Sequence, residues 1–255
     1  MVSGIVSSLI ASFLIAVAAL AWRNREVLPA LSVALRPWVT VRVSMSALLR
    51  IGRDDRYVLF HTPYTPGSYG PPGGVFKFHP EGTTTLDRLS FRADRRAEHR
   101  DVTLSDLRGF LPGSALAPFL RWFDRGADRE SVVECLRREL TEELKEVGHA
   151  ELAPGVADLT FKPVRRVIEP PRKVPGKDFR QLRVFEVQEA VIADEAAWRT
   201  LRRLTELAED PAEQRVIMVS AQEIIDGRHG DSLIGPQSAF LFGTRRYRQD
   251  LPPGR

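Results

Sequence analysis

The hydrophobic pattern changes character along the chain. Residues 4–22 (GIVSSLIASFLIAVAALAW) form one apolar run without a charged side chain, whereas apolar and polar positions are mixed further on. About 20 apolar residues, rising about 1.5 Å each, are enough to cross a hydrocarbon core of about 30 Å. The pattern therefore predicts four parts: a transmembrane anchor (1–25), a juxtamembrane linker (26–37), a folded domain (38–250) and a tail (251–255).

A cleaved signal peptide is the alternative interpretation of the apolar run, because Ala19-Leu20-Ala21 resembles a cleavage site. The first four residues carry no basic side chain, however, and the run exceeds the usual apolar length of about 7–15 residues. A retained anchor is the better prediction. Arg23 and Arg25 follow the run at once, so the positive-inside rule places the N-terminus outside and the domain in the cytoplasm.

A second membrane segment is a weaker hypothesis. Residues 27–49 begin with an apolar stretch, but charges at mid-membrane cost about 2.5–3.5 kcal/mol each. The stretch is interrupted at Pro29, Arg36, Pro37 and Arg42. An interfacial or loop segment fits this pattern better, and the sequence leaves the choice open.

The remaining pattern predicts a mixed α and β domain. Val39, Val41 and Val43 alternate with polar residues, which is typical of a strand. Strands are expected at 38–51, 56–61, 75–78, 160–168, 181–192 and 215–219, helices at 115–123, 129–147 and 196–208, and turns at 54–55, 66–74 and 170–175. Ser220 and Glu223 form the capping-box pattern of a further short helix. This order predicts an α+β or α/β sandwich around one core.

The predicted helix at 129–147 combines an apolar stripe with an acidic face. At about 100° per residue, Val133, Leu136, Leu140, Leu144 and Val147 share the stripe. Beside it lie four carboxylates, Glu139, Glu142, Glu143 and Glu146. Like charges at this spacing repel, and a hard cation such as Mg²⁺ or Mn²⁺ would relieve the repulsion. A solvated acidic face, with Arg137, Arg138 and Lys145 as counter-charges, explains the same spacing.

Composition excludes several classes of protein. Hydrophobic residues make up 43% and charged residues 27%, which is ordinary for a globular chain. A single cysteine, Cys135, excludes a disulfide framework and a cysteine-based metal cage, and is expected to be a packed side chain. The net charge of +4 is too small to indicate a nucleic-acid binder. The five histidines lack ligand spacing, and no P-loop, zincin or serine-hydrolase motif occurs.

The acidic helix carries a recognisable motif. Residues 138–143 (RELTEE), with Glu130 eight positions before Arg138, give E-x7-R-E-U-x-E-E, where U is aliphatic. This resembles the core of the Nudix box. Asp124 and Lys145 stand where that box has glycines, and Gly126 follows Asp124. Gly73-Gly74 resemble the glycine pair that opens the box, so the box is expected to be split by an insertion at 79–128.

A narrower resemblance covers most of the chain, from about residue 41 to about residue 235. It is carried by the N-terminal apolar run and by the segments RVSMSALLRI (42–51), GPPGGVFKF (70–78), DLRGFLP (106–112), FLRWF (119–123) and 129–144. Together they resemble the SMODS-associated Nudix domains of bacterial anti-phage defence systems of the CBASS type. That group often has two membrane spans, whereas this sequence shows one clear span.

The resemblance implies a Nudix-like α/β/α sandwich and roles for particular residues. Glu139, Glu142, Glu143 and Arg138 would be catalytic, Glu130, Glu139, Glu142 and Glu143 would hold Mg²⁺ or Mn²⁺, and Gly73 and Gly74 would approach the phosphates. Two of these roles have plainer alternatives. Glu130 would otherwise be a helix-start acid behind an Asp128 cap, and the two glycines would merely join two strands. Phe119, Trp122 and Phe123 are expected in the core or a lid.

The implied function is a single-pass protein of the bacterial inner membrane that senses or hydrolyses a nucleotide-derived signal. Its partners would be a nucleotide or cyclic oligonucleotide, the membrane and a cyclic-oligonucleotide synthase, but not duplex nucleic acid. Two alternatives stay open. One is a housekeeping, membrane-tethered Nudix pyrophosphohydrolase, and the other is a catalytically silent nucleotide-binding module.

Overall fold

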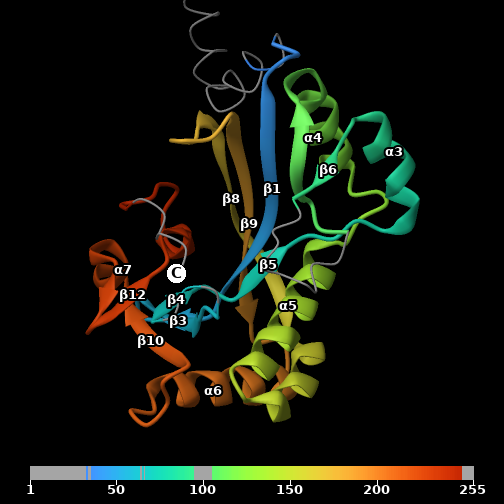
Figure 1. Cartoon of the computed structure of the whole chain (residues 1–255). Coiled ribbons are helices and arrows are strands. Elements are labelled where there is room, and N and C mark those ends of the chain that lie inside the picture. Colours follow the sequence, from blue (N-terminus) through green and yellow to red (C-terminus); the bar gives the residue numbers. More distant parts are fainter. Residues whose placement is uncertain (1–32, 34–35, 64, 66, 95–104, 249–255) are drawn as a thin grey trace, which may run out of the picture.

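The computed structural model describes residue 33 and residues 36–63, 65, 67–94 and 105–248. Their strands form two sheets, and Figure 1 shows the long strands of the first sheet between α4 and α5 on one side and the second sheet on the other. The predicted mixed α and β class is confirmed. The expected anchor at 1–25 lies outside the described residues, among which no helix is long and apolar enough to cross a membrane.

The first sheet has the strand order β6-β7-β1-β9-β8, with the short β5 also paired with β1. Its strands are β1 (Thr40–Arg50), β5 (Gly73–Val75), β6 (Arg92–Ala93), β7 (Arg108–Pro112), β8 (Thr160–Lys173) and β9 (Phe179–Val191). The central strand β1 runs parallel to β9 and antiparallel to β7 and β5. Because β7 pairs with residues 40–44 and β5 with residues 46–48, both occupy the same edge of β1 in succession.

The second sheet has the order β10-β3-β4-β12-β11, with β2 paired with β3. Its strands are β2 (Gly52–Arg53), β3 (Arg56–His61), β4 (Ser68–Gly70), β10 (Val216–Ser220), β11 (Arg228–His229) and β12 (Ser232–Ile234). The predicted turn at Asp54-Asp55 is confirmed, and both residues have positive φ. The returning strand β3 pairs with β2 rather than with β1, so the chain passes from the first sheet to the second at Ile51.

Helices cover these sheets. The α-helices are α3 (Thr83–Arg88), α4 (Leu116–Arg125), α5 (Val132–Glu146), α6 (Glu195–Glu209) and α7 (Ala221–Asp226), and the 3₁₀ helices are η1 (Pro80–Gly82), η2 (Gly113–Ala115), η3 (Ala150–Asp158) and η4 (Pro236–Leu241). The predicted capping box of Ser220 and Glu223 is confirmed at the start of α7. The insertion at 79–128 contains η1, α3, η2 and α4, together with strands β6 and β7.

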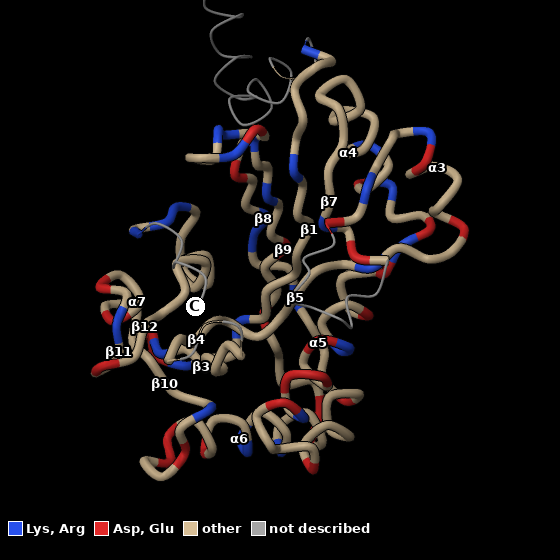
Figure 2. Tube along the Cα trace, in the orientation of Figure 1, with Lys and Arg blue, Asp and Glu red and all other residues tan. Residues whose placement is uncertain are grey.

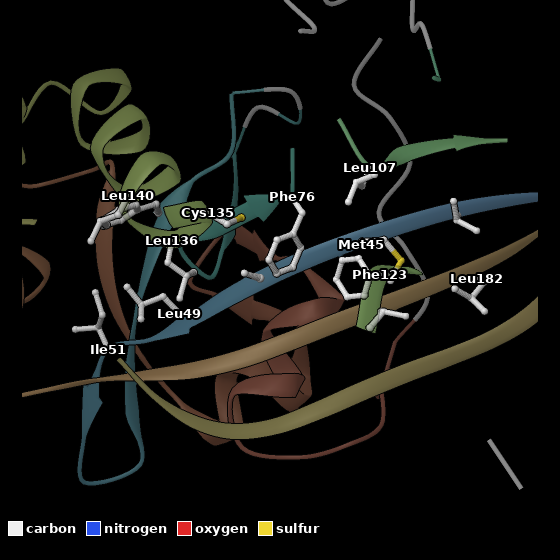
Figure 3. Close-up of a cluster of buried hydrophobic side chains, with 14 of the residues drawn as sticks. Met45, Leu49, Ile51, Phe76, Leu107, Phe123, Cys135, Leu136, Leu140 and Leu182 are labelled. Atoms are coloured by element: carbon white, nitrogen blue, oxygen red, sulfur yellow. The ribbon is translucent and has the colours of Figure 1, made fainter. Parts of the chain in front are cut away.

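The buried side chains form two clusters rather than the single core that the pattern suggested. Odd-numbered residues of β1, such as Met45 and Leu49, join the larger cluster with the apolar faces of α4 and α5 (Figure 3). Leu48, on the other face, joins a smaller cluster with Phe240 of η4 and with the second sheet. The prediction of one core was wrong because β1 is buried on both faces, as its nine buried consecutive residues show.

The prolines after Ile168 do not end a strand. A turn was predicted at 170–175, but β8 continues through Pro170 and Pro171 to Lys173. Its register with β9 shifts between Glu169 and Arg172, and β8 forms the edge of the sheet. Proline is tolerated at bulges and edges because its missing N–H is not required there. The strand therefore extends further than the prolines indicate.

Helix α5 supplies a paired test of this packing. Leu140 is fully buried in the larger cluster, whereas Val133 is 39% exposed. We expect Leu140→Ala to lower the free energy of unfolding by about 2–5 kcal/mol, because the cavity it leaves cannot close completely. Val133→Ala is expected to cost less than about 1 kcal/mol. Denaturant unfolding of both variants measures this, and equal losses would contradict the packing described.

Candidate functional site

The helix that carries the acidic face begins one turn later than the sequence suggested. Ser131 is its N-cap, and it forms a capping box with Glu134. Asp128 was predicted as a possible cap, but it has a positive φ of 62° and precedes the helix by several residues. Ser131 is the N-cap because its hydroxyl accepts a hydrogen bond from the Glu134 N–H, and the Glu134 carboxylate accepts one from the Ser131 N–H. Two backbone donors at the start of the helix are thereby satisfied.

The predicted apolar stripe of α5 is confirmed at four of its five positions. Leu136, Leu140, Leu144 and Val147 are buried. Val133, the fifth, is partly exposed, and Cys135 is buried in the cluster as expected for a packed side chain. This packing fixes the rotation of α5, so that Glu139 and Glu143 point toward strand β5.

The two glycines allow two close approaches, of α5 to β5 at Gly74 and of β5 to β1 at Gly73. The Gly73 N–H donates to Glu143 Oε2 at 3.1 Å. A Cβ on Gly74 would overlap the Glu139 carboxylate, and a Cβ on Gly73 would overlap the backbone carbonyl of Ala47 in β1. Gly73 also has a φ of +128°, which side-chain-bearing residues rarely adopt. The two glycines thus do more than join strands, since they let carboxylates approach bare backbone.

Arg138 is the centre of an ion-pair network around these carboxylates. Its Nε and Nη2 donate to the two oxygens of Glu130 at 2.7 and 2.9 Å, and its Nη1 donates to Glu139 at 2.7 Å. Longer contacts reach Glu142 at 3.4 Å, and Nη2 also donates to the Val75 carbonyl at 2.9 Å. Burial alone would lower the pKa of Arg138, but the hydrogen bonds and charges of Glu130 and Glu139 outweigh it and raise that pKa above its usual range. Arg138 is therefore permanently charged and holds β5 and two carboxylates together.

Glu130 lies just before the N-cap and is almost entirely buried. Its Oε2 accepts the Lys77 N–H at 2.9 Å, and both of its oxygens accept from Arg138. These contacts favour a positioning role over that of a helix-start acid, because they join the strand that follows Gly74 to Arg138. A direct role of Glu130 as a metal ligand stays a prediction.

The two ends of the insertion at 79–128 are held together beside this network. Phe78 and Arg129 form an isolated antiparallel bridge, the His79 N–H donates to the Asp128 carbonyl at 2.8 Å, and the Glu130 N–H donates to the Lys77 carbonyl at 2.9 Å. We call these pairings the neck. The neck returns the chain to the point where it left β5, so the split box is reassembled in space.

The electrostatics of the acidic face are uneven. Burial raises the pKa of Glu139, although the Arg138 charge opposes the shift. Burial and the Glu139 charge raise the pKa of Glu143 well above its usual range, although the Gly73 N–H opposes this. Glu142 is about half exposed, at 49% of its side chain, and Glu146 is exposed. Burial also raises the pKa of Glu146, so Glu139, Glu143 and, to a smaller degree, Glu146 carry a desolvation penalty when ionised.

One carboxylate near the site was missed by the sequence reasoning. Asp106 forms an isolated bridge with Lys77, and its charge contributes to raising the pKa of Glu139. Burial raises the pKa of Asp106 itself. Asp106 begins the DLRGFLP segment that was used for the resemblance, so that segment was the available signal. Its position shows that the insertion brings an acidic residue to the site.

The donor set suits a hard divalent cation, although the described residues contain no group of three His, Cys, Asp or Glu side chains already arranged around one point. Arg138 instead contacts three of the four predicted ligands, Glu130, Glu139 and Glu142. The Glu143 carboxylate instead accepts a hydrogen bond from an uncharged donor, the Gly73 N–H. Oxygen ligands with raised pKa values are stabilised as anions by such a cation.

The aromatic residues of α4 belong to the core and not to a lid. Phe119, Trp122 and Phe123 are all at least 93% buried. Arg129 stacks on the Phe123 ring at 3.9 Å and donates to the Phe123 carbonyl, which ties α4 to the neck. A surface pocket of about 420 Å³ lies elsewhere, beside Pro37 and Arg92, and no carboxylate of α5 lines it.

Comparison with known families agrees with this geometry. The family model of the SMODS-associated NUDIX domain matches residues 40–242, which include both glycines, the neck and all of α5. The chain belongs to this family. Comparison with curated proteins gives no match. Nudix domains generally use divalent metals, and carboxylates such as those of α5 are groups that bind such ions.

The Arg138 network predicts an effect on stability. Glu130→Gln removes a largely buried negative charge and one good acceptor while leaving Arg138 in place. We expect a loss of about 2–3 kcal/mol in the free energy of unfolding, below the full cost of breaking a buried pair because Arg138 is 20% exposed. Glu209→Gln, which removes the exposed partner of Arg56, is the control and is expected to change it by less than about 1 kcal/mol. Equal effects in chemical denaturation would contradict the network.

Proposed function

We propose that this SMODS-associated Nudix domain recognises and hydrolyses a nucleotide-derived signal with the help of a divalent cation, in bacterial anti-phage defence. The observation that carries the proposal is the approach of Glu139 and Glu143 to the bare backbone of Gly74 and Gly73. These two carboxylates have raised pKa values, and a divalent cation bound beside them would stabilise their ionised forms. Family membership supports the defence context.

In this proposal Glu139, Glu142 and Glu143 hold Mg²⁺ or Mn²⁺. When bound, the cation supplies charge neutralisation on phosphate oxygens and lowers the pKa of a water ligand. Arg138 orients Glu139 and Glu142 by ion pairing, and Glu130 fixes Arg138 against the strand after Gly74. We further propose that the apolar run at 4–22 anchors the domain to the cytoplasmic face of the inner membrane, beside a cyclic-oligonucleotide synthase.

A silent nucleotide-binding module is the second candidate, and one observation favours it. Arg138 engages three of the acidic side chains, so part of their charge is already compensated without a metal. Lys145, at the place of the box's second glycine, adds a further positive charge to α5. In this case the same site would bind the signal without turning it over. A housekeeping pyrophosphohydrolase would share the geometry of the first candidate and differ only in substrate.

Metal binding is tested first, separately from catalysis. We expect Mn²⁺ at 100 times its dissociation constant to raise the free energy of unfolding by about 2.7 kcal/mol, as mass action requires. Glu143→Gln is expected to abolish this rise, because a neutral amide is a poor ligand for a hard cation. Glu146→Gln, an exposed carboxylate on the same helix, is the control and should retain it. An unfolding temperature of the wild-type chain that does not change when Mn²⁺ or Mg²⁺ is added would contradict metal binding.

Hydrolysis is tested by chromatography of the products formed from a panel of nucleoside diphosphate derivatives and cyclic oligonucleotides, because cleavage of a pyrophosphate or phosphodiester bond leaves phosphomonoesters. We expect activity that requires Mg²⁺ or Mn²⁺ and that falls about 100-fold or more in Glu142→Gln and in Glu143→Gln, since each removes charge that stabilises the transition state. Glu146→Gln should stay within a few-fold of the wild type. A preference for housekeeping nucleotides within the panel would support the plain pyrophosphohydrolase.

Calorimetry with the same panel separates the enzyme from the binding module. Tight binding of a cyclic oligonucleotide by the wild type without any turnover would support the module and contradict hydrolysis. Gly74→Ala provides a matched test of the site, because its Cβ displaces the Glu139 carboxylate. Gly243→Ala, where a Cβ meets only an ordinary contact at 3.4 Å, is the control.

A further inference from the structure

The end of the first sheet where β1 begins is basic and carries an exposed tryptophan. Trp38 is 78% exposed, an unusual state for so large an apolar side chain. Arg36 and Pro37 beside it are also exposed. Thr40, two residues further on, pairs with Phe179 at the start of β9. The hairpin that joins β8 to β9 therefore lies next to Trp38.

The tip of this hairpin, residues 172–180, carries four basic side chains and one acidic side chain. The basic residues are Arg172, Lys173, Lys177 and Arg180, and the acidic residue is Asp178. All but the half-buried Arg180 are exposed. Figure 2 shows the blue positions at this tip and just before β1. We call Arg36, Trp38 and the tip together the basic end.

We propose that the basic end docks on the surface of an anionic lipid bilayer. Tryptophan is enriched at membrane interfaces, where its ring meets apolar chains and its N–H meets water. Lysine and arginine near anionic lipids each favour binding about fivefold. A face that combines an exposed tryptophan with basic side chains suits an anionic bilayer. The exposure of the Trp38 ring is then explained, because lipid would cover it.

The position of the basic end supports this occupant. The inference rests on the proposed anchor at 4–22, which leaves residues 23–32 as the tether, because Val33 already packs in the larger cluster. Ten residues reach at most about 36 Å when fully extended, so the start of β1 stays near the bilayer. The eleven residues of β1 carry the chain about 36 Å further, toward α6, which Figure 1 shows at the opposite end. The basic end is thus the part of the domain nearest the lipid.

The experiment uses the full chain in phospholipid vesicles with one fluorophore. Cys135 is buried and the pKa of its thiol is raised by burial, so it stays unreacted while an added exposed cysteine is labelled. Lys177→Cys places the label at the tip. Arg203→Cys places it on α6, where that side chain is 69% exposed, as the matched control. Vesicles contain phosphatidylcholine alone or with phosphatidylserine, and quenching is measured with lipid-borne quenchers and with aqueous iodide.

Docking predicts that phosphatidylserine vesicles shield the label at 177 from iodide and expose it to lipid-borne quenchers, with little change at 203. The shielding should fall at high salt because exposed charges are screened. Adding Arg172→Ala and Lys173→Ala should lower the ratio of docked to undocked chains about 25-fold. Adding Arg199→Ala and Arg202→Ala on α6 instead should leave that ratio unchanged.

Two outcomes would overturn the docking. One is equal iodide quenching at 177 and 203 in phosphatidylserine vesicles, and the other is stronger shielding of 177 by duplex nucleic acid than by vesicles. Flotation with phosphatidylcholine vesicles tests the anchor separately. If the chain floats but the label at 177 is not shielded, the anchor is supported and docking is contradicted. If the chain does not float but phosphatidylserine vesicles shield the label at 177, the anchor is contradicted and docking is supported.

Discussion

The site depends on one close approach, in which carboxylates of α5 meet strand β5 at two residues without side chains. Gly74 leaves the space that the Glu139 carboxylate occupies, and Gly73 offers its N–H to Glu143. A side chain at Gly74 would separate helix from strand, whereas a side chain at Gly73 would collide with the Ala47 carbonyl of β1. The packing of Leu136, Leu140 and Leu144 on the larger cluster supplies the stabilisation that offsets the burial of these charges.

The neck explains how a box interrupted by some fifty residues keeps its geometry. The entropic cost of closing a loop grows only slowly with its length, so a few backbone hydrogen bonds at its base are enough to define its ends. The bridge between Phe78 and Arg129 provides such a base, and Glu130 links the same point to Arg138. The distance in sequence between Gly74 and Glu130 is therefore of little consequence for the arrangement of the site.

Local patterns in the sequence predicted the elements well, and the arrangement between elements poorly. The strand around Val41, the rotation of most of α5 and the capping box at Ser220 follow from spacing within one element. Ser131 was missed as the N-cap because Asp128 satisfies the same residue preference and only the backbone angles decide between them. Val133 was placed in the stripe because the helical wheel does not show where the covering layer ends.

The hydrophobic pattern did not predict which strands pair with one another. Nothing near β1 in sequence indicates that β7 and β5 share its edge, or that β9 runs parallel to it. The sequence predicted those site residues that belong to the motif, namely the two glycines, Glu130, Arg138 and the glutamates of α5. Asp106 reaches the same place through the fold of the insertion, and no local spacing relates it to the motif.

The neck makes residues 79–128 look like a removable module, since a short turn would bridge its two ends. The neighbours of β1 rule this out. Excising the segment would delete β7 and α4. Residues 40–44 would lose their hydrogen-bonded partner, and Met45 would lose the aromatic side chains that cover it. The insertion lies outside the motif but is an integral part of the domain. A related protein without this insertion must cover that edge of β1 with another segment.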